Sequence, residues 1–194
     1  MKTKKPKEKY YKKVNRKNEI KKRQDYSWVL VISISAFWIS FIFSFLSEMV
    51  LGSVNFIIAI LLTLFFIFLG ILFDMIGLSV TVANPAVFHS MATKKIKGSR
   101  LASKLIKNSE KTSSFCNDVI GDICGIISGS TAVAISTTLA SSLNVSPFLI
   151  TLIVTALVAS LTIGGKALGK SIAINNSTKI LYHFTKTLSL FTKG

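Results

Sequence analysis

The sequence predicts an all-α, polytopic integral membrane protein with four transmembrane helices and cytoplasmic amphipathic interfacial helices. Half of the 194 residues are hydrophobic. They gather in runs of about 20 residues or more, which is the length a helix needs to cross roughly 30 Å of bilayer hydrocarbon. The 24 Lys and Arg residues lie in segments beside these runs, as is typical of loops at a membrane surface.

Residues 1–25 form a predicted basic cytoplasmic arm. They hold 12 Lys or Arg residues against Glu8, Glu19 and Asp25, and they show no apolar periodicity. A segment of this composition buries no core, so we expect it to lie on the anionic headgroups of the lipid bilayer. The net charge of +16 would also suit nucleic acid, but membrane topology and lipid headgroups explain basic residues beside apolar runs. We therefore expect a lipid partner and no nucleic acid.

A helical membrane domain is predicted over residues 26–194. Its predicted spans cover 27–46, 54–82, 115–139 and 148–165, and its predicted interfacial helices cover 91–111 and 171–193. Trp28 opens the first run at the bilayer interface, and this run is too long for a signal peptide. Asn84-Pro85 ends the second span, because proline disfavours a helical conformation at the residue before it.

The distribution of Lys and Arg predicts the orientation of the spans. Residues 1–25, the segment 91–111 and the region after Gly165 hold 12, 7 and 5 basic residues, whereas the connections Ser47–Ser53 and Ser141–Pro147 hold none. Positively charged loops stay in the cytoplasm. We therefore expect a multi-pass protein of the cell membrane with both termini in the cytoplasm.

The two interfacial segments combine basic residues with apolar ones at helical spacing. In 91–111, seven Lys or Arg residues accompany Glu110 alone, and the apolar residues partly follow one helix face. In 171–193, apolar residues alternate with three lysines. Both segments are therefore predicted to be amphipathic helices on the cytoplasmic surface of the membrane.

The sequence contains no catalytic constellation, so we expect a protein that is not an enzyme. Cys116 and Cys124 lie in one predicted span, roughly 12 Å apart along a helix, which is too far for a disulfide bond. We interpret both as small buried hydrophobic residues. His89 and His183 have no cysteine or carboxylate at metal-ligand spacing, so they predict no metal site.

Five charged residues fall inside or at the edges of the predicted spans, where an unpaired charge costs at least ~2.5 kcal/mol near the bilayer centre. They are Asp74, Asp118, Asp122, Lys166 and Lys170. Each lies in the predicted cytoplasmic half, and each span that carries them has glycines on roughly the same face, which let helices approach closely. These positions predict that the charges converge on a cavity open to the cytoplasm.

A simpler interpretation stays open for some of these residues. Lys166 and Lys170 would be helix-end anchors whose ammonium groups reach the lipid headgroups. Asp118 would only help to start a helix near its positive end. Asp74 lies roughly 15 Å along its helix from the cytoplasmic end, so we favour a functional or pairing role for it.

Four short motifs follow one another between Phe73 and Lys193. They are Asp74 to Gly77, Lys97-Gly98, Ile120-Gly121-Asp122, and Gly165-Lys166-Ala167-Leu168-Gly169-Lys170. Their order and spacing resemble the transmembrane domain of the cyclin M and CorB/CorC family of magnesium transporters. That domain carries, in turn, a Ser-x-x-Glu-type motif, a basic segment with Lys-Gly, an Ile-Gly-Asn-type span and a Gly-Glu-x-x-Pro-Lys motif.

The resemblance implies a homodimeric membrane domain that transports Mg²⁺ or another divalent cation. The family's cytoplasmic CBS domains, which bind adenine nucleotides, have no counterpart after Lys193. We therefore expect any such control to come from a separate cytoplasmic regulatory subunit.

This sequence departs from the family pattern at the residues that matter for a cation. Gly77 and Lys166 stand where the family has glutamates, Asp122 stands at its asparagine, and Gly169 at its proline. Magnesium prefers about six oxygen ligands, and a protonated lysine has no lone pair to donate. Lys166 would therefore repel the ion that the family binds.

Two functions follow from these departures. In the first, Asp74 and Asp122 replace the lost carboxylates as metal ligands and a cation still crosses the membrane. Hydroxyl oxygens would then come from Ser79, Ser128 and Thr162. In the second, Lys166 occupies the cation slot and pairs with Asp74 or Asp122 inside the membrane. The chain would then be a non-transporting regulatory or assembly subunit.

Overall fold

A computed structural model of the chain describes residues 27–45 and 56–191. Contacts divide the chain into two units, Met1–Ile39 and Ser40–Gly194. The predicted basic arm and the predicted external connection Ser47–Ser53 lie outside the described residues.

Four helices of the described residues are long and apolar enough to cross a membrane. They are Ser27–Phe45, Phe56–Val82, Ser109–Leu143 and Pro147–Leu190. The helical class and the four candidate spans that the sequence predicts are therefore confirmed by length and composition.

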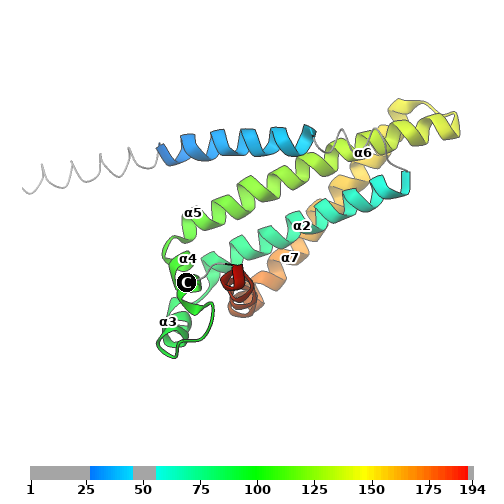
Figure 1. Cartoon of the computed structure of the whole chain (residues 1–194). Coiled ribbons are helices and arrows are strands. Elements are labelled where there is room, and N and C mark those ends of the chain that lie inside the picture. The colour runs from blue at the N-terminus through cyan, green and yellow to red at the C-terminus, as the bar shows by residue number, and fades with distance from the viewer. Residues whose placement is uncertain (1–26, 46–55, 192–194) are drawn as a thin grey trace, which may run out of the picture. The chain divides into compact units, whose positions relative to one another are not determined.

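Three long helices form the body of the second unit. They are α2 (Phe56–Val82), α6 (Asp122–Leu143) and α7 (Pro147–Phe191), and each contacts the other two (Figure 1). Between α2 and α6 the chain forms α3 (Pro85–Thr93), α4 (Ser99–Lys107), α5 (Ser109–Ser114) and η1 (Phe115–Gly121). The last of these is a π-helix that continues α5 into α6 without a break.

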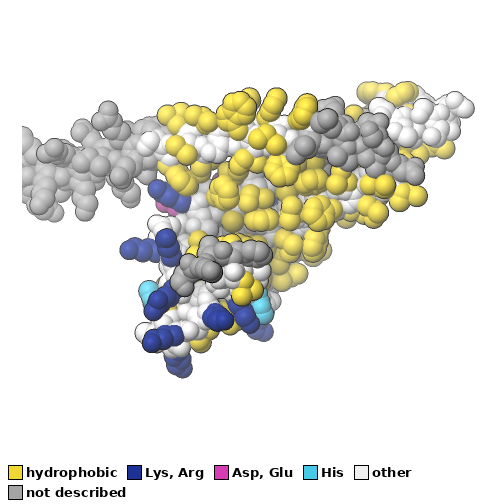
Figure 2. Space-filling view, viewed as in Figure 1, with side chains coloured by type: hydrophobic (Ala, Val, Ile, Leu, Met, Phe, Trp, Pro, Cys, Tyr) yellow, Lys and Arg dark blue, Asp and Glu magenta, His cyan; other side chains and the backbone are white. Residues whose placement is uncertain are grey.

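Small and polar side chains fill the contacts of α2, while large apolar ones point outward. The buried residues of α2 include Ala59, Thr63, Gly70 and Gly77. Its exposed residues include Ile57, Leu61, Phe65 and Phe68, and Figure 2 shows hydrophobic side chains over the surface of the long helices. Small residues at helix contacts and large apolar ones outside are typical of helices that pack within lipid.

A hydrogen bond between two buried threonines joins α2 to α6. The Thr63 and Thr131 hydroxyl oxygens lie 2.7 Å apart, and each is also within reach of a carbonyl of its own helix, Ala59 for Thr63 and Ser128 for Thr131. The two hydroxyl groups are thus satisfied within the protein, as polar groups of a helix in a membrane would need to be.

Replacing Thr131 with valine is expected to lower the free energy of unfolding by about 0.6–1.7 kcal/mol, the range measured for interhelical hydrogen bonds in membranes. Thermal unfolding of the detergent-purified protein measures the loss. Thr138→Val is the matched control, because the exposed Thr138 hydroxyl binds only the Ala134 carbonyl of its own helix. An equal loss in both variants would show that the contact with Thr63 contributes nothing.

The basic end of this unit consists of α3, α4 and the part of α7 after Asn176. Its core is a cluster of Val80, Ala83, Phe88, Ala102 and Leu181. Asn84 starts α3, because its side-chain oxygen accepts a hydrogen bond of 2.9 Å from the Ala86 amide. Pro85 follows at the first helical position, which agrees with the predicted break at Asn84-Pro85.

The segment 91–111, predicted as one amphipathic helix, is divided in the structure. Helix α3 ends at Thr93, and α4 begins only at Ser99. Lys95 and Gly98 between them have positive φ angles of 56° and 84°, which no right-handed helix contains. The apolar residues Leu105 and Ile106 of α4 are half-buried and pack on the core cluster of the basic end.

The fourth span also differs from its prediction, because α7 continues from Pro147 to Phe191. The predicted helix end near Gly165 is not found, whereas the separate helix predicted at 171–193 is found with a later start, because α7 consists of two helices joined across a kink at Asn176. The described helix leaves helical geometry at Asn176 alone, with φ −121° and ψ 23°. Glycine is expected to end helices in water, but here Gly165 and Gly169 pack against α2, and this contact favours a continuous helix.

Candidate functional site

Asp74 lies at the tightest contact of α2, on the face that meets η1 and α6. Asp74 is 6% exposed to solvent. One turn before it, a Cβ atom on Gly70 would lie 3.1 Å from the Cys124 Cβ atom. Almost one turn after it, a Cβ atom on Gly77 would overlap the Asn117 side chain and lie 3.1 Å from the Cys116 Cβ atom. Because residues at this spacing share a helix face, the Asp74 carboxylate is held between these two contacts, against η1.

The π-helix η1 supplies an amide to the same interface. The Asn117 side-chain nitrogen donates to the Ser113 hydroxyl at 3.3 Å, but its oxygen Oδ1 is buried without a hydrogen-bond partner. Oδ2 of Asp74 and Oγ of Ser79 are also buried and without a partner among the described residues. Unsatisfied buried oxygens are costly, and single turns of π-helix frequently mark functional sites.

Lys166 brings an ammonium group from α7 to the same stretch of η1. Its Nζ atom lies 3.6 Å from the position that a Cβ atom on Gly121 would take. Gly165 and Gly169 hold α7 close to α2, where Cβ atoms would lie within 3.3 Å of Ile71 and within 3.0 Å of Met75 respectively. A larger side chain at position 121 would therefore contact the Lys166 ammonium group. Glycine at this position leaves space for that group.

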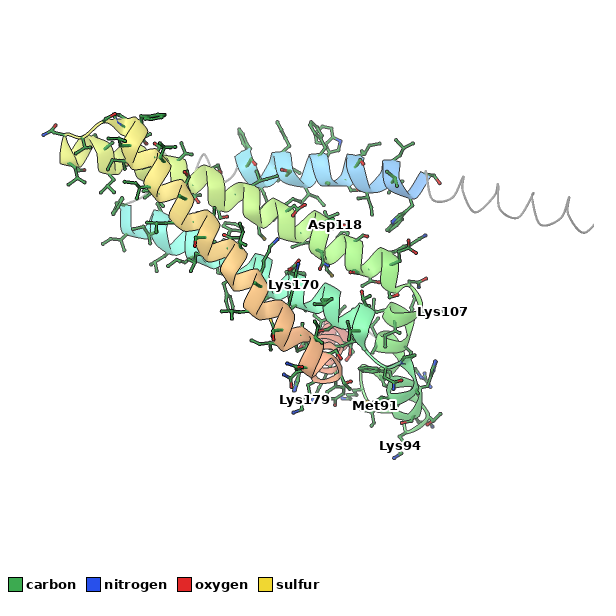
Figure 3. All side chains as sticks on the ribbon, turned by 180° about the vertical axis from the view of Figure 1, so that it is seen from behind. Met91, Lys94, Lys107, Asp118, Lys170 and Lys179 are labelled. Atoms are coloured by element: carbon green, nitrogen blue, oxygen red, sulfur yellow. The ribbon has the colours of Figure 1, made fainter. Side chains whose placement is uncertain are left out.

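Three of the five predicted charges differ from Asp74 and Lys166 in exposure. Asp118, Asp122 and Lys170 are exposed, whereas Asp74 is buried and Lys166 is half-buried. Figure 3 shows Asp118 and Lys170 on different helices. Exposure does not test whether the five charges face one open cavity, so their convergence stays a prediction. The sequence argument assumed α-helical spacing throughout, and the π-turn Phe115–Gly121 changes the register of the residues around it.

The predicted hydroxyl ligands have other partners or lie apart. The Ser128 hydroxyl donates to the Gly125 carbonyl at 3.0 Å, and the Thr162 hydroxyl donates to the Val158 carbonyl at 2.8 Å. Ser79 is fully buried five residues after Asp74. Among the described contacts, those of the glycines place Lys166 near η1, and the burial of Asp74 places it on the α2 face between Gly70 and Gly77.

The donor set at this contact is small for a divalent cation. The described residues contain no group of three or more His, Cys, Asp and Glu side chains that could hold a metal ion. Asp74 is the carboxylate at the contact, and Asn117 adds one amide oxygen, while Mg²⁺ takes six oxygen ligands in an octahedron. The nearby ammonium group of Lys166 adds a positive charge that opposes a bound cation.

Asn117 is the site residue that the sequence analysis missed. Asp122 was expected at the family's asparagine position, but the structure places the Asn117 amide against Gly77 and leaves Asp122 exposed. The available signal was an asparagine near the start of a predicted span, next to Asp118.

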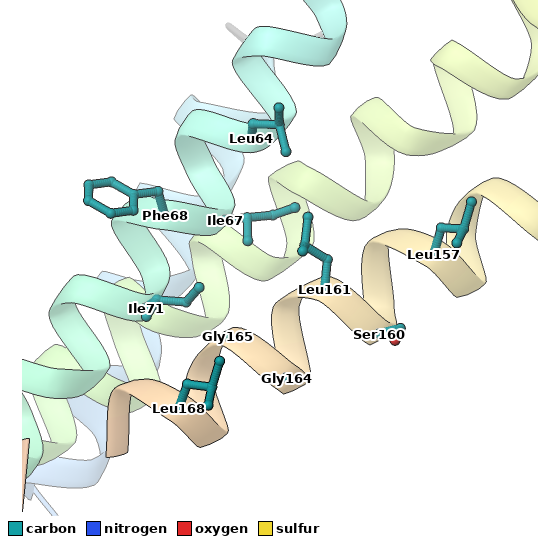
Figure 4. Close-up of a pocket in the computed structure, with 10 residues that line it drawn as sticks. All are labelled: Leu64, Ile67, Phe68, Ile71, Leu157, Ser160, Leu161, Gly164, Gly165 and Leu168. Atoms are coloured by element: carbon teal, nitrogen blue, oxygen red, sulfur yellow. The ribbon is translucent and has the colours of Figure 1, made fainter. Parts of the chain in front are cut away.

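A groove with a volume of about 580 Å³ lies between α2 and α7. Figure 4 shows the residues that line this groove, which are Leu64, Ile67, Phe68, Ile71, Leu157, Ser160, Leu161, Gly164, Gly165 and Leu168. Neither Asp74 nor Lys166 lines it, so the groove offers apolar contacts and no charge.

Comparisons of the chain with models of protein families, with curated proteins and with solved structures found no match. The resemblance to the cyclin M and CorB/CorC membrane domain therefore stays a prediction that depends on the sequence pattern alone.

Proposed function

We propose that the chain is a multi-pass protein of the cell membrane in which Lys166 fills a transporter-like cation slot beside Asp74. In this proposal the protein is a non-transporting regulatory or assembly subunit with the membrane architecture of the CorB/CorC family. The observation that carries the proposal is the approach of Lys166 Nζ to Gly121 on η1. Gly121 in turn contacts α2 at Gly70, one turn from Asp74.

Charge balance supports this choice. Asp74 is a buried carboxylate in a candidate span, and a lone charge there costs several kcal/mol. Asp118 and Asp122 are exposed, so they add no negative charge to the buried contact. The described residues show no ion pair between Lys166 and Asp74, but one ammonium group near η1 and one carboxylate at the α2–η1 contact would together leave no net negative charge with which to hold a divalent cation.

Cation transport is the second candidate, and the unpaired oxygens favour it. Oδ2 of Asp74 and Oδ1 of Asn117 are both buried acceptors without a partner. A cation that enters the α2–η1 contact would satisfy both at once. If the protein transports a cation, the native site binds magnesium. If Lys166 fills the cation slot, only a variant that lacks this lysine binds magnesium.

The deciding experiment is the thermal stability of the detergent-purified protein across a magnesium titration, with Lys166→Glu beside the wild type. A ligand that binds only the folded state raises stability by about 2.7 kcal/mol at 100 times its Kd. We expect no magnesium-specific rise in the wild type and a saturable rise in Lys166→Glu. The wild type stays flat because its own ammonium group already occupies the slot.

Lys170→Glu is the matched control, because Lys170 lies one turn further along α7 and is exposed. We expect no magnesium effect in this variant. A saturable magnesium-specific rise in the wild type would establish the second candidate instead. A Lys166→Glu protein that is as stable as the wild type and ignores magnesium would remove the support for a lysine in a cation slot.

The remaining parts of the proposal concern orientation and assembly. The positive-inside rule favours a cytoplasmic location for the basic end and both termini. Gly125 and Gly129 of α6 support a homodimer, because no atom of the described residues lies within 4 Å of the position that a Cβ atom would take on either. Open glycine surfaces of this kind accept a second helix in membranes. A separate cytoplasmic subunit would supply any nucleotide control.

A further inference from the structure

Helix α4 has an apolar face and a basic face. Arg100, Lys104 and Lys107 follow one another at spacings of four and three residues, so they share one side of the helix. All three side chains are exposed. We call these three residues the basic stripe. The opposite side carries Ala102, which is fully buried in the core cluster of the basic end.

Contacts on both sides of the α3–α4 turn fix the orientation of this stripe. Gly98 precedes α4, and a Cβ atom there would lie 2.8 Å from the Lys186 backbone nitrogen and 2.9 Å from the Thr185 carbonyl carbon of α7. Ser99, at the start of α4, is also fully buried. These contacts fix the rotation of α4 about its axis, so the basic stripe faces away from the core cluster.

The stripe is electrostatically unfavourable without a partner. Like charges three and four residues apart destabilise a helix, and Glu110 is the single acidic residue from α3 to α5. Lys94, Lys95 and Lys97 of the preceding loop are exposed too and add positive charge. An anionic partner would convert this repulsion into attraction, so the chemistry of the surface calls for phosphate or carboxylate groups.

The position of α4 between two candidate membrane spans indicates which kind of anionic partner it can reach. Helix α3 begins at Pro85, close after the last residue of α2 at Val82, and α5 begins at Ser109, directly after α4. Two candidate spans therefore hold the segment at both ends. Figure 2 shows Lys and Arg side chains gathered beyond the hydrophobic surface of the spans, and Figure 3 shows Lys94, Lys107 and Lys179 at this end.

We propose that the basic stripe of α4 binds the phosphate groups of anionic phospholipids in the leaflet that borders the basic end. Lipid headgroups are the anions that lie at the ends of membrane spans. Arg100 offers paired N–H donors for phosphate oxygens, and the two lysines add point charges at the same face. This inference does not depend on the proposed function of Lys166.

The test uses the full chain in a neutral detergent with added phosphatidylglycerol or phosphatidylcholine of the same acyl chains. The melting temperature is followed against lipid concentration to obtain an apparent Kd for each lipid. We expect phosphatidylglycerol to raise the melting temperature of the wild type more than phosphatidylcholine does. Neutralising a basic residue near the surface weakens such binding roughly fivefold, so Arg100→Gln/Lys104→Gln/Lys107→Gln is expected to weaken it about 100-fold.

Two control variants separate the stripe from net charge. Lys170→Gln/Lys179→Gln/Lys186→Gln removes the same charge from α7, where Lys170 lies before the kink at Asn176 and apart from the helix face that Lys179 and Lys186 share, and it is expected to lose less affinity. Lys104→Arg/Lys107→Arg keeps the charge of the stripe and is expected to bind like the wild type. Equal losses in the α4 and α7 triple variants would overturn the proposal, because the effect would then follow net charge alone.

Two further ligands identify the source of the phosphate. Glycerol phosphate without acyl chains is expected to compete weakly, since it lacks the anchorage that concentrates headgroups at the membrane. An RNA oligonucleotide is expected to leave the lipid affinity unchanged. Tight RNA binding that the α4 triple variant abolishes would overturn the lipid assignment. So would phosphatidylglycerol binding that survives in that variant while circular dichroism shows the native helix content.

Discussion

Replacing Gly98 with alanine is expected to destabilise the protein by about 2–4 kcal/mol, through backbone strain and steric overlap together. The φ angle of Gly98 is 84°, which costs an L-residue with a side chain roughly 1–2 kcal/mol. The new methyl group would also lie 2.8–2.9 Å from the backbone of Thr185 and Lys186. Backbone atoms of a helix cannot move aside as a flexible side chain can, so the turn or α7 must shift. Thermal unfolding in detergent, followed by circular dichroism, measures the loss.

Gly164→Ala is the matched control for this prediction. Gly164 lies inside α7, and no atom of the described residues lies within 4 Å of the position of the added methyl group. An alanine in a helix interior is preferred to glycine by roughly 0.5–1 kcal/mol, so this variant is expected to be neutral or slightly more stable. If Gly98→Ala unfolds at the wild-type temperature, the α3–α4 turn does not contact α7 as described. The fixed orientation of the basic stripe would then lose its basis.

Local chemistry made part of the fold predictable from sequence. The break after α2 was found because Asn84 and Pro85 favour a helix start by their own side chains. The position of the break in α7 was not found, because it depends on packing. The glycines near Lys166 indicated a helix end, yet two of them lie against Ile71 and Met75. In a membrane, a glycine without a side chain lets two helices pack closely. In water, the same glycine would destabilise its helix.

The candidate site was predictable only where a charge stood in an apolar run. Asp74 and Lys166 were identified for this reason, because the cost of an unpaired charge in a membrane span is large. Asn117 is neutral and gave no comparable signal. The π-helix η1 packs against Gly77, and no residue pattern in the sequence indicated its π-helical geometry. The exposed positions of Asp118 and Asp122 could not be predicted without that geometry.

Replacing Lys166 with methionine is expected to destabilise the protein by about 1–3 kcal/mol, if its ammonium group compensates the Asp74 charge. Methionine keeps the apolar length of the side chain, so the loss would report the charge more than the packing. This loss is smaller than that for a fully buried ion pair, because Lys166 is half-buried and solvent or lipid headgroups screen its charge. Asp74→Asn is expected to lose less, since the freed lysine can extend toward the surface.

The double variant Asp74→Asn/Lys166→Met decides whether the two charges act together. We expect it to be more stable than Lys166→Met alone, with a coupling energy of about 1–2 kcal/mol in the double-mutant cycle. Asp74→Asn/Lys170→Met is the control cycle, and its effects are expected to add within about 0.5 kcal/mol, because Lys170 is exposed. Additive effects in the first cycle would mean that Lys166 does not balance Asp74. A Lys166→Met protein that magnesium stabilises would then assign the unpaired oxygens of Asp74 and Asn117 to a cation, as the transport alternative requires.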